Sequence, residues 1–238
     1  GGFNCQLRLY TQYYAELVRV GGNTILIGNV PREIPATMQL FDTNSELRHV
    51  YAWWNGSSVS LISSNIQPTW NSAFGYWTAT GDPSHSYLGS WLPLEAHTAP
   101  YALLRSCYNQ NASYANSSAL LSTAAISNSG IDRVTAKLIS LPGDILQING
   151  DMEVTQTIAS TTAFFVTDLK VNGTTAFTRH NSVPNAGRYT TTVINFTIQR
   201  ARTDTVGMPV FTLAVRASVA NYGNVNASML NVVSRRNL

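Results

Sequence analysis

The chain carries little charge. Charged residues make up 11 % of its 238 residues, against roughly a quarter in an ordinary soluble protein. Serine, threonine and asparagine fill the polar positions instead. A surface of neutral polar groups avoids long-range self-repulsion, so we expect this chain to pack against copies of itself.

Lysine is nearly absent, with two lysines against thirteen arginines. Arginine pairs with carboxylate and phosphate through parallel hydrogen bonds and tolerates partial burial, which suits subunit interfaces and phosphate contacts alike. The basic residues form no dense run with interleaved aromatics, the pattern of a dedicated nucleic-acid reader. We therefore expect any RNA contact to be weak and non-specific. The candidates for RNA or inter-subunit contacts, with a pure solubility role equally open, are Arg8, Arg19, Arg235 and Arg236.

Cysteines and long apolar runs are also scarce. Two cysteines, Cys5 and Cys107, make no disulfide framework, and we expect both thiols to be free, as in a reducing compartment. No apolar run approaches the ~18–20 residues that span a bilayer. The sequence therefore predicts no membrane span.

Known catalytic spacings are missing as well. The sequence has neither a nucleophile elbow nor a phosphate-binding glycine loop. Asp82, Ser84 and His85 are close together, but a catalytic triad depends on spatial geometry and not on adjacency, so a polar turn is the preferred interpretation. No histidine lies at metal-ligand spacing, and we expect neither a metal nor a cofactor.

Paired carboxylates remain the last enzymatic possibility, because glycosidase acids can be remote in sequence. The candidates are more simply turn and strand-edge residues: Asp42, Glu46, Asp151 and Glu153. We therefore predict that the protein is not an enzyme.

The dominant pattern in the sequence is an alternation of apolar and polar residues. This period of two is typical of half-buried antiparallel strands. The clearest cases are Ala163–Val171, Tyr189–Arg200 and Phe211–Val219. Shorter predicted strands are Leu17–Val20, Thr24–Ile27, Val59–Ile62, Ala136–Ile139, Ile145–Ile148 and Val225–Val233.

Turn and helix signals complete the prediction. Asn149-Gly150 and Asn172-Gly173 are the best two-residue hairpin turns. Weak helix signals cover Glu46–Tyr51 and Ala115–Ala125. We predict an all-β chain, a single antiparallel sandwich domain of about eight strands over residues 1–238 with long connecting loops.

Residues 64–130 interrupt the alternation. This stretch is rich in proline, serine and asparagine, and we predict a loop-rich insertion with one or two short strands. Long loops in compact domains usually serve function or interfaces. The aromatic residues there suggest either a sugar-binding platform or, preferably, packing and interface residues. The interface candidates are Trp70, Trp77 and Trp91.

The segment "ELRHVYAWWNGSSVSLIS" (46–63) resembles a segment of picorna-like virus coat proteins. In those proteins an apolar approach ends in an aromatic residue, followed by a Gly-Ser/Thr step and an alternating strand. Here these elements are Trp53-Trp54, Asn55-Gly56-Ser57, and a strand beginning at Val59. The position of the segment, about 50 residues into the chain, is most similar to that in the small coat protein of comovirus-like plant viruses (secoviruses).

This resemblance implies an eight-stranded jelly-roll capsid domain and a structural, non-enzymatic role. The expected partners are copies of this chain, a larger coat protein or two further coat proteins, and genomic single-stranded RNA. The expected location is the virion, assembled in the host cytoplasm, and Trp53 and Trp54 are expected to pack at the start of one jelly-roll strand. The alternative is a secreted or fibre-tip carbohydrate-binding sandwich, which predicts a Cys5–Cys107 bridge and glycosylated asparagines.

Overall fold

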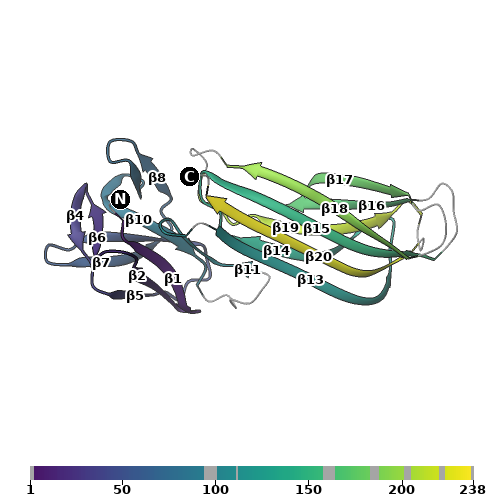
Figure 1. Ribbon diagram of the computed structural model, residues 1–238, viewed down its shortest axis with the longest axis horizontal. Coiled ribbons are helices and arrows are strands. Elements are labelled where there is room, and N and C mark those ends of the chain that lie inside the picture. Colours follow the sequence, from purple (N-terminus) through teal and green to yellow (C-terminus); the bar gives the residue numbers. More distant parts are fainter. Residues whose placement is uncertain are drawn as a thin grey trace.

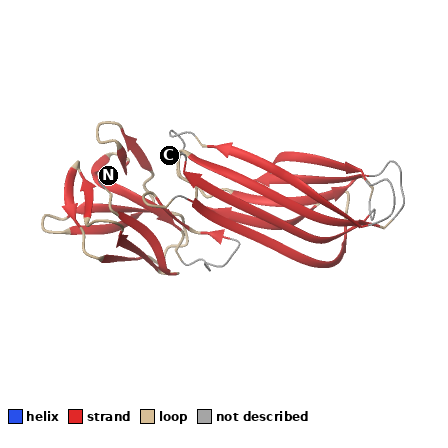
Figure 2. Ribbon diagram, viewed as in Figure 1, coloured by secondary structure: helices blue, strands red, loops and turns tan. Residues whose placement is uncertain are grey.

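The chain folds entirely into strands and loops within the part that is described, which confirms the predicted all-β class. The computed structural model describes residues 3–93, 101–110, 112–157, 164–182, 188–200, 205–219 and 223–236. Figure 1 shows an elongated molecule with an N-terminal lobe at one end and a sandwich of long strands at the other. Among the described residues, Figure 2 shows no helix.

The N-terminal lobe consists of short strands in three sheets. β1, β2 and β5 form one sheet, and β3 pairs with β4. The largest sheet has the order β7-β6-β10-β9-β8, with β12 added to β10. The bounds are β1 Cys5–Thr11, β2 Tyr14–Arg19, β3 Thr24–Ile27, β4 Val30–Glu33, β5 Thr37–Phe41, β6 Arg48–Trp54, β7 Val59–Ser64, β8 Pro68–Asn71, β9 Tyr76–Ala79, β10 Asp82–Trp91 and β12 Leu104–Ser106.

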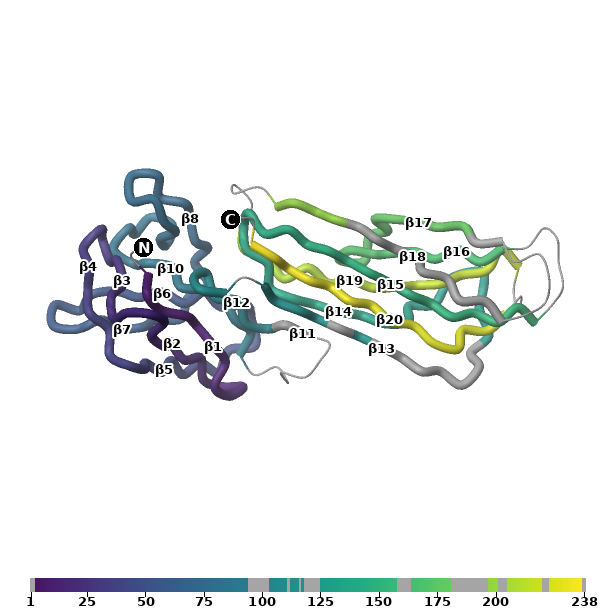
Figure 3. The backbone as a smooth tube through the Cα atoms, in the orientation of Figure 1, coloured from purple at the N-terminus to yellow at the C-terminus, as the bar shows by residue number. Residues whose placement is uncertain are grey.

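The sandwich consists of two facing sheets. One has the order β13-β20-β15-β18 and the other the order β11-β14-β19-β16-β17, and their long strands run side by side in Figure 3. The bounds are β11 Tyr101–Ala102, β13 Ala112–Ala125, β14 Ile131–Leu138, β15 Asp144–Gln156, β16 Phe164–Val171, β17 Thr174–Ser182, β18 Arg188–Gln199, β19 Val210–Ala217 and β20 Gly223–Arg236. All pairings are antiparallel except that of β11 with β14.

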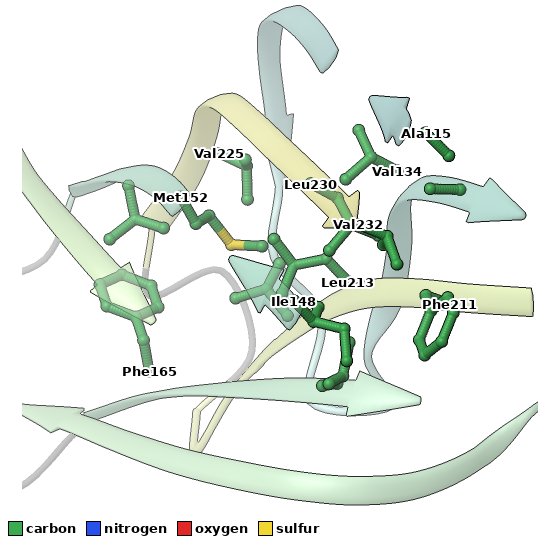
Figure 4. Close-up of a cluster of buried hydrophobic side chains, with 14 of the residues drawn as sticks. Ala115, Val134, Ile148, Met152, Phe165, Phe211, Leu213, Val225, Leu230 and Val232 are labelled. Carbon is green, nitrogen blue, oxygen red and sulfur yellow. The ribbon is translucent and has the colours of Figure 1, made fainter. Parts of the chain in front are cut away.

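The sandwich core follows from the alternation in the sequence. Burial in β15 alternates at every residue from Asp144 to Gln156, as expected for a strand with one face toward a core. Met152 and Ile148 of this strand meet Leu213 and Phe165 from the opposite sheet (Figure 4). The sandwich therefore has a continuous apolar core.

Two turn predictions have opposite outcomes. Asn172-Gly173 connects β16 and β17 with positive φ at both residues, as a two-residue hairpin turn of type I′ requires. Asn149-Gly150 is no turn, because both residues lie inside β15 and pair with β18 and β20. A Cβ at Gly150 would lie 3.2 Å from Leu213 Cδ1, so the glycine leaves room for the facing side chain.

The helix and loop predictions are wrong for a common reason. Residues 46–51 and 115–125 fall largely in β6 and β13, which pair with neighbouring strands. Residues 64–130 contain the six strands β8–β13 instead of one or two. Pairing partners far away in the sequence override weak local preferences. Of the predicted single sandwich over 1–238, residues 112–236 supply nearly all the strands of the two facing sheets.

Candidate functional site

The junction between the two lobes contains a buried ion pair. Arg105 lies in β12 of the N-terminal lobe, and Asp144 is the first residue of β15 in the sandwich. The Nη2–Oδ1 distance is 3.1 Å and the Nε–Oδ2 distance is 3.3 Å, with both side chains 0 % exposed. This bidentate geometry is the strong form of a charged hydrogen bond, so it ties one lobe to the other.

The other hydrogen-bonding groups of this ion pair also have partners. Asp144 Oδ2 accepts hydrogen bonds from Ser234 Oγ at 2.6 Å and from the Leu141 amide at 3.0 Å. Arg105 Nη1 donates to the Gln110 carbonyl at 3.0 Å. A buried charge pair is tolerated only when its other hydrogen-bonding groups are satisfied, and here they are.

Apolar packing continues the junction. One buried cluster combines Tyr51, Trp77 and Tyr87 of the N-terminal lobe with Ile139 and Leu141 of the segment that follows β14. Because the two lobes share this core, the junction is an extended contact and not a flexible linker.

A basic and thiol-containing cluster lies beside the ion pair. Arg236 Nη2 is 3.5 Å from Cys107 Sγ. Burial lowers the pKa of Arg236, but Cys107 and Asp144 beside it outweigh that effect and raise it. Burial raises the pKa of Cys107 despite the opposing effect of Arg236, and burial followed by proximity to Cys107 raises the pKa of Cys5 to about 12. Both thiols are free and buried and stay protonated at neutral pH, which makes them poor nucleophiles.

The predicted arginine contacts divide into two kinds. Arg8 binds Glu16 at 2.6 Å and is mostly exposed, and Arg235 is exposed near the end of β20. Arg19 instead donates from Nε to the Ile34 carbonyl at 2.9 Å, and Arg236 points into the junction. Arg8, Arg19 and Arg235 are therefore exposed to an external partner, whereas Arg236 is only partly exposed.

The three predicted interface tryptophans differ in exposure. Trp91 is 0 % exposed in the core of the N-terminal lobe and has no surface to offer a neighbour. Trp77 is 7 % exposed and belongs to the junction core. Trp70 is 37 % exposed and borders an open hollow of about 360 Å³ with Asn71 and Asp82. Trp70 is therefore the tryptophan of the three that a neighbour can reach.

The segment that carried the family resemblance forms a hairpin in the N-terminal lobe. The Asn55 amide donates to the Ser58 carbonyl at 3.1 Å across the turn between β6 and β7. Trp54 packs on the core of that lobe, and Trp53 stacks on His85 with ring centroids 5.8 Å apart. Both tryptophans are packing residues, but their strand, β6, lies outside the two sheets of the sandwich.

The Asp82, Ser84 and His85 group lacks the geometry of a triad. His85 Nδ1 lies 2.7 Å from Asp82 Oδ2 and 3.2 Å from Ser84 Oγ. A relay needs the acid and the nucleophile on different ring nitrogens, whereas both contacts here involve Nδ1. The Ser84 amide also donates to Asp82 Oδ1 at 2.9 Å, which is the pattern of a polar turn.

The described ranges contain neither a metal-binding cluster nor a membrane-crossing helix. No group of three or more histidine, cysteine or acidic residues is placed there to hold a metal ion. No helix in that part of the chain has the length and apolar character needed to cross a bilayer.

Sequence reasoning missed the junction pair entirely. Arg105 and Asp144 are 39 residues apart, and each looks like an ordinary charged residue in its own segment. The one available signal is that Arg105 lies between the apolar Leu103-Leu104 and Ser106-Cys107, a setting that demands a buried partner without identifying it.

Comparisons with known proteins give only distant likenesses. No family model and no curated protein matches the chain. It is similar to a structure of infectious bursal disease virus, Gx strain, at 12 % identity and a TM-score of 0.38, covering 98 % of this chain and 58 % of that one. A second likeness, to a T13 particle of the same virus, has 11 % identity and a TM-score of 0.38, covering 99 % and 68 %.

A third likeness involves a different class of protein. The insecticidal delta-endotoxin Cry8Ea1 of Bacillus thuringiensis shares 9 % identity at a TM-score of 0.29, covering 97 % of this chain and 51 % of that one. The chain thus spans little more than half the length of the first structure, and scores this low carry no assignment. They give no support to comovirus-like plant viruses in particular.

Proposed function

We propose that the chain is a structural coat protein of a small icosahedral positive-strand RNA virus. In this role it assembles with copies of itself and with further coat subunits to enclose the genome, and it performs no catalysis. The sparse charge, the abundance of Ser, Thr and Asn and the resemblance of residues 46–63 to picorna-like coat proteins support the proposal.

The observation that carries the proposal is the strand order of the sandwich. Consecutive strands β13 to β16 alternate between the sheets, and so do β17 to β20, giving the orders β13-β20-β15-β18 and β14-β19-β16-β17. We infer that these eight strands form a jelly roll, the double Greek key that recurs in viral capsid domains. The jelly roll then covers residues 112–236 and is preceded by a separate lobe.

Assembly would use the flanks of the sandwich and the attached lobe. Each contact in a symmetric shell can be weak because it repeats around every symmetry axis. The buried Arg105–Asp144 pair supports this mechanism, because a lobe held in fixed orientation presents Trp70 at the same position in every copy.

RNA would be a weak, non-specific partner in this proposal. The exposed Arg8 and Arg235 are available for phosphate contacts, and such contacts are sequence-independent and salt-dependent. A larger coat protein, or two further ones, would complete the shell in the virion, with assembly in the host cytoplasm.

The rival carbohydrate-binding function is less well supported. Lectins share the jelly-roll architecture, but the secreted rival predicts a Cys5–Cys107 bridge, and both thiols are free. Intact mass spectrometry of native material separates the two. A mass near 25.9 kDa with two alkylatable thiols supports the coat protein, and added glycan mass with a bridge supports the rival.

Negative-stain microscopy of the native material tests the proposal directly. Uniform icosahedral particles support it, whereas monodisperse small species under every assembly condition contradict it. Trp70→Ala tests the interface, with Ser72→Ala on the rim of the same hollow as the matched control. We expect Trp70→Ala alone to reduce particle yield at unchanged thermal stability, and an undiminished yield removes Trp70 from the interface.

A further inference from the structure

A second hollow lies at the end of the N-terminal lobe farthest from the sandwich. It encloses about 470 Å³ between the hairpin of β3 and β4 and the turn that follows β6. Both hairpins lie at the outer end of the lobe in Figure 1. The hollow is separate from the junction and from Trp70, and the proposed coat function assigns it no role.

Arg32 is the distinctive residue of this hollow. Its guanidinium carbon lies 4.0 Å from the centroid of the Trp54 ring, and Trp54 itself packs on the buried core. The stacking holds the cation in place, since a guanidinium over an indole face is favourable. Arg32 Nε is buried and makes no hydrogen bond, and no described residue forms an ion pair with this side chain.

The neighbouring Arg19 provides the contrast. Its Nε donates to the Ile34 carbonyl at 2.9 Å, and its Nη2 donates to the same oxygen. Arg19 Nη2 also lies 4.0 Å from Glu33 Oε1. Arg19 is thus held by the protein itself, whereas Arg32, whose guanidinium is a planar fork of donors, lines the hollow without a counter-ion among the described residues. Such a fork matches a carboxylate.

The rim supplies one free hydroxyl donor, on Ser58, and one acceptor, because the Ser57 hydroxyl already donates to Asn55 Oδ1 at 3.1 Å. The Ser57 and Ser58 amides bind Asn55 Oδ1 at 3.0 and 2.9 Å, so the turn holds both serines in place. Ser58 Oγ accepts from Asn55 Nδ2 at 3.3 Å, which leaves its proton for a ligand. Glu33 Oε1 accepts from Asn23 Nδ2 at 2.6 Å, which leaves the second carboxylate oxygen available.

These groups select the charge and the chemistry of a ligand. Glu33 repels a dianion such as phosphate more strongly than a monoanionic carboxylate, because like charges repel at close range. It accepts readily from a hydroxyl, while Arg32 needs an anion. We propose that this hollow binds an acidic sugar, with the carboxylate on Arg32 and hydroxyls on Ser58 and Glu33.

Ligand-observed NMR titration of the full chain tests the proposal with four probes: glucuronate, glucose, acetate and inorganic phosphate. We expect saturable binding of glucuronate and at least roughly tenfold weaker binding of the other three, since a charged hydrogen bond contributes about a factor of ten. Absence of saturable glucuronate binding, or phosphate binding that is equally tight, overturns the proposal.

Substitutions then locate the site. Arg32→Gln should weaken glucuronate binding about tenfold, whereas Lys170→Gln, which removes a cation from an exposed ion pair in the sandwich, should leave it unchanged. Glu33→Gln should narrow the preference for glucuronate over phosphate. If Arg32→Gln fails to fold, Glu33→Gln and Ser58→Ala still test whether glucuronate binds in this hollow, because both positions are exposed. Glucuronate binding that ignores all three substitutions overturns the site.

Discussion

The two lobes differ in the length of their strands and in the composition of their cores. Strands of the N-terminal lobe are three to ten residues long, and its core includes the fully buried Trp91. Strands of the sandwich are eight to fourteen residues long apart from β11, around a core without tryptophan. Long strands enclose one continuous core between two sheets, whereas the short strands divide among three sheets around a core that includes Trp91.

This difference provides a convenient measurement. All five tryptophans lie at or before Trp91, so intrinsic tryptophan fluorescence reports on the N-terminal lobe and the junction. Far-UV circular dichroism reports on both lobes. The comparison between the lobes can therefore be tested by following each substitution with the two signals.

The largest effect is expected from removing the acidic partner in the junction. Asp144→Ala leaves Arg105 buried without a counter-ion, which costs about 3–5 kcal/mol. We expect urea unfolding to start at lower denaturant and the two signals to separate into two transitions. Asp132→Ala is the control, because its ion pair with Lys170 is exposed and contributes only about 0–1 kcal/mol. Equal effects of the two substitutions would contradict a structural role for the junction.

Acid should act on the N-terminal lobe through His49. Its Nδ1 lies 2.7 Å from Ser90 Oγ in a fully buried setting, where burial, followed by the nearby Arg48, lowers its pKa from 6.5 to about 4. The unfolded chain binds this proton more readily, so stability is complete above pH 6.5 and falls as the pH drops toward 4. The loss amounts to about 3 kcal/mol.

Urea unfolding at pH 7 and at pH 4.5, followed by tryptophan fluorescence, measures this loss. His49→Gln should flatten the pH dependence between these values. His180→Gln, at an exposed position in β17 of the sandwich, should leave it unchanged. A pH dependence that survives His49→Gln assigns the acid sensitivity to other groups.

The sequence predicted the sandwich better than the N-terminal lobe for a physical reason. In β19, Phe211, Leu213 and Val215 are all buried, and a long alternation of this kind is visible without knowledge of the partner strand. In β8 and β9, four residues each, no alternation can develop, and the stretch looked like loops. Length alone was not decisive, because the four-residue β3 matches the predicted strand Thr24–Ile27, whereas the fourteen-residue β13 was predicted in part as a helix.

Sites were harder to predict than strands because they join distant segments. The spacing of Arg105 and Asp144 carries no signal, since the chain path between them decides whether they meet. The aromatic character of Trp77 and Trp91 was visible, but their burial was not. The stacking of Arg32 on Trp54 could not be predicted from the sequence either, because Arg32 belongs to one hairpin and Trp54 to another.

A close backbone contact tests how tightly β12 is held in the N-terminal lobe. Gly89 in β10 has φ +154°, and a Cβ there would lie 2.4 Å from the Arg105 carbonyl oxygen. Gly89→Ala must push β12 away and should cost about 1–3 kcal/mol more than Gly81→Ala. Gly81 has φ +80° with open space around it, so it carries backbone strain without the contact.

Thermal unfolding of the two alanine variants, followed by tryptophan fluorescence and by far-UV circular dichroism, measures this difference in stability. We expect Gly89→Ala to separate the fluorescence transition from the circular dichroism transition, since β12 carries Arg105 into the junction. If the two alanine variants unfold alike, β12 tolerates displacement and the contact contributes little.

The smallest expected effect, that of Ile→Val substitutions, compares the hydrophobic cores of the two lobes directly. Ile25 and Ile148 are both 0 % exposed, one in each lobe, and Ile→Val removes one methylene at a cost of about 0.5–1.5 kcal/mol. Because the junction couples the lobes, we expect Ile148→Val to shift the fluorescence transition as much as Ile25→Val does. In the Asp144→Ala background that coupling should be lost, and Ile148→Val should then shift only the circular dichroism signal. A fluorescence transition that ignores Ile148→Val in the wild-type chain would mean that the lobes unfold independently despite their shared core.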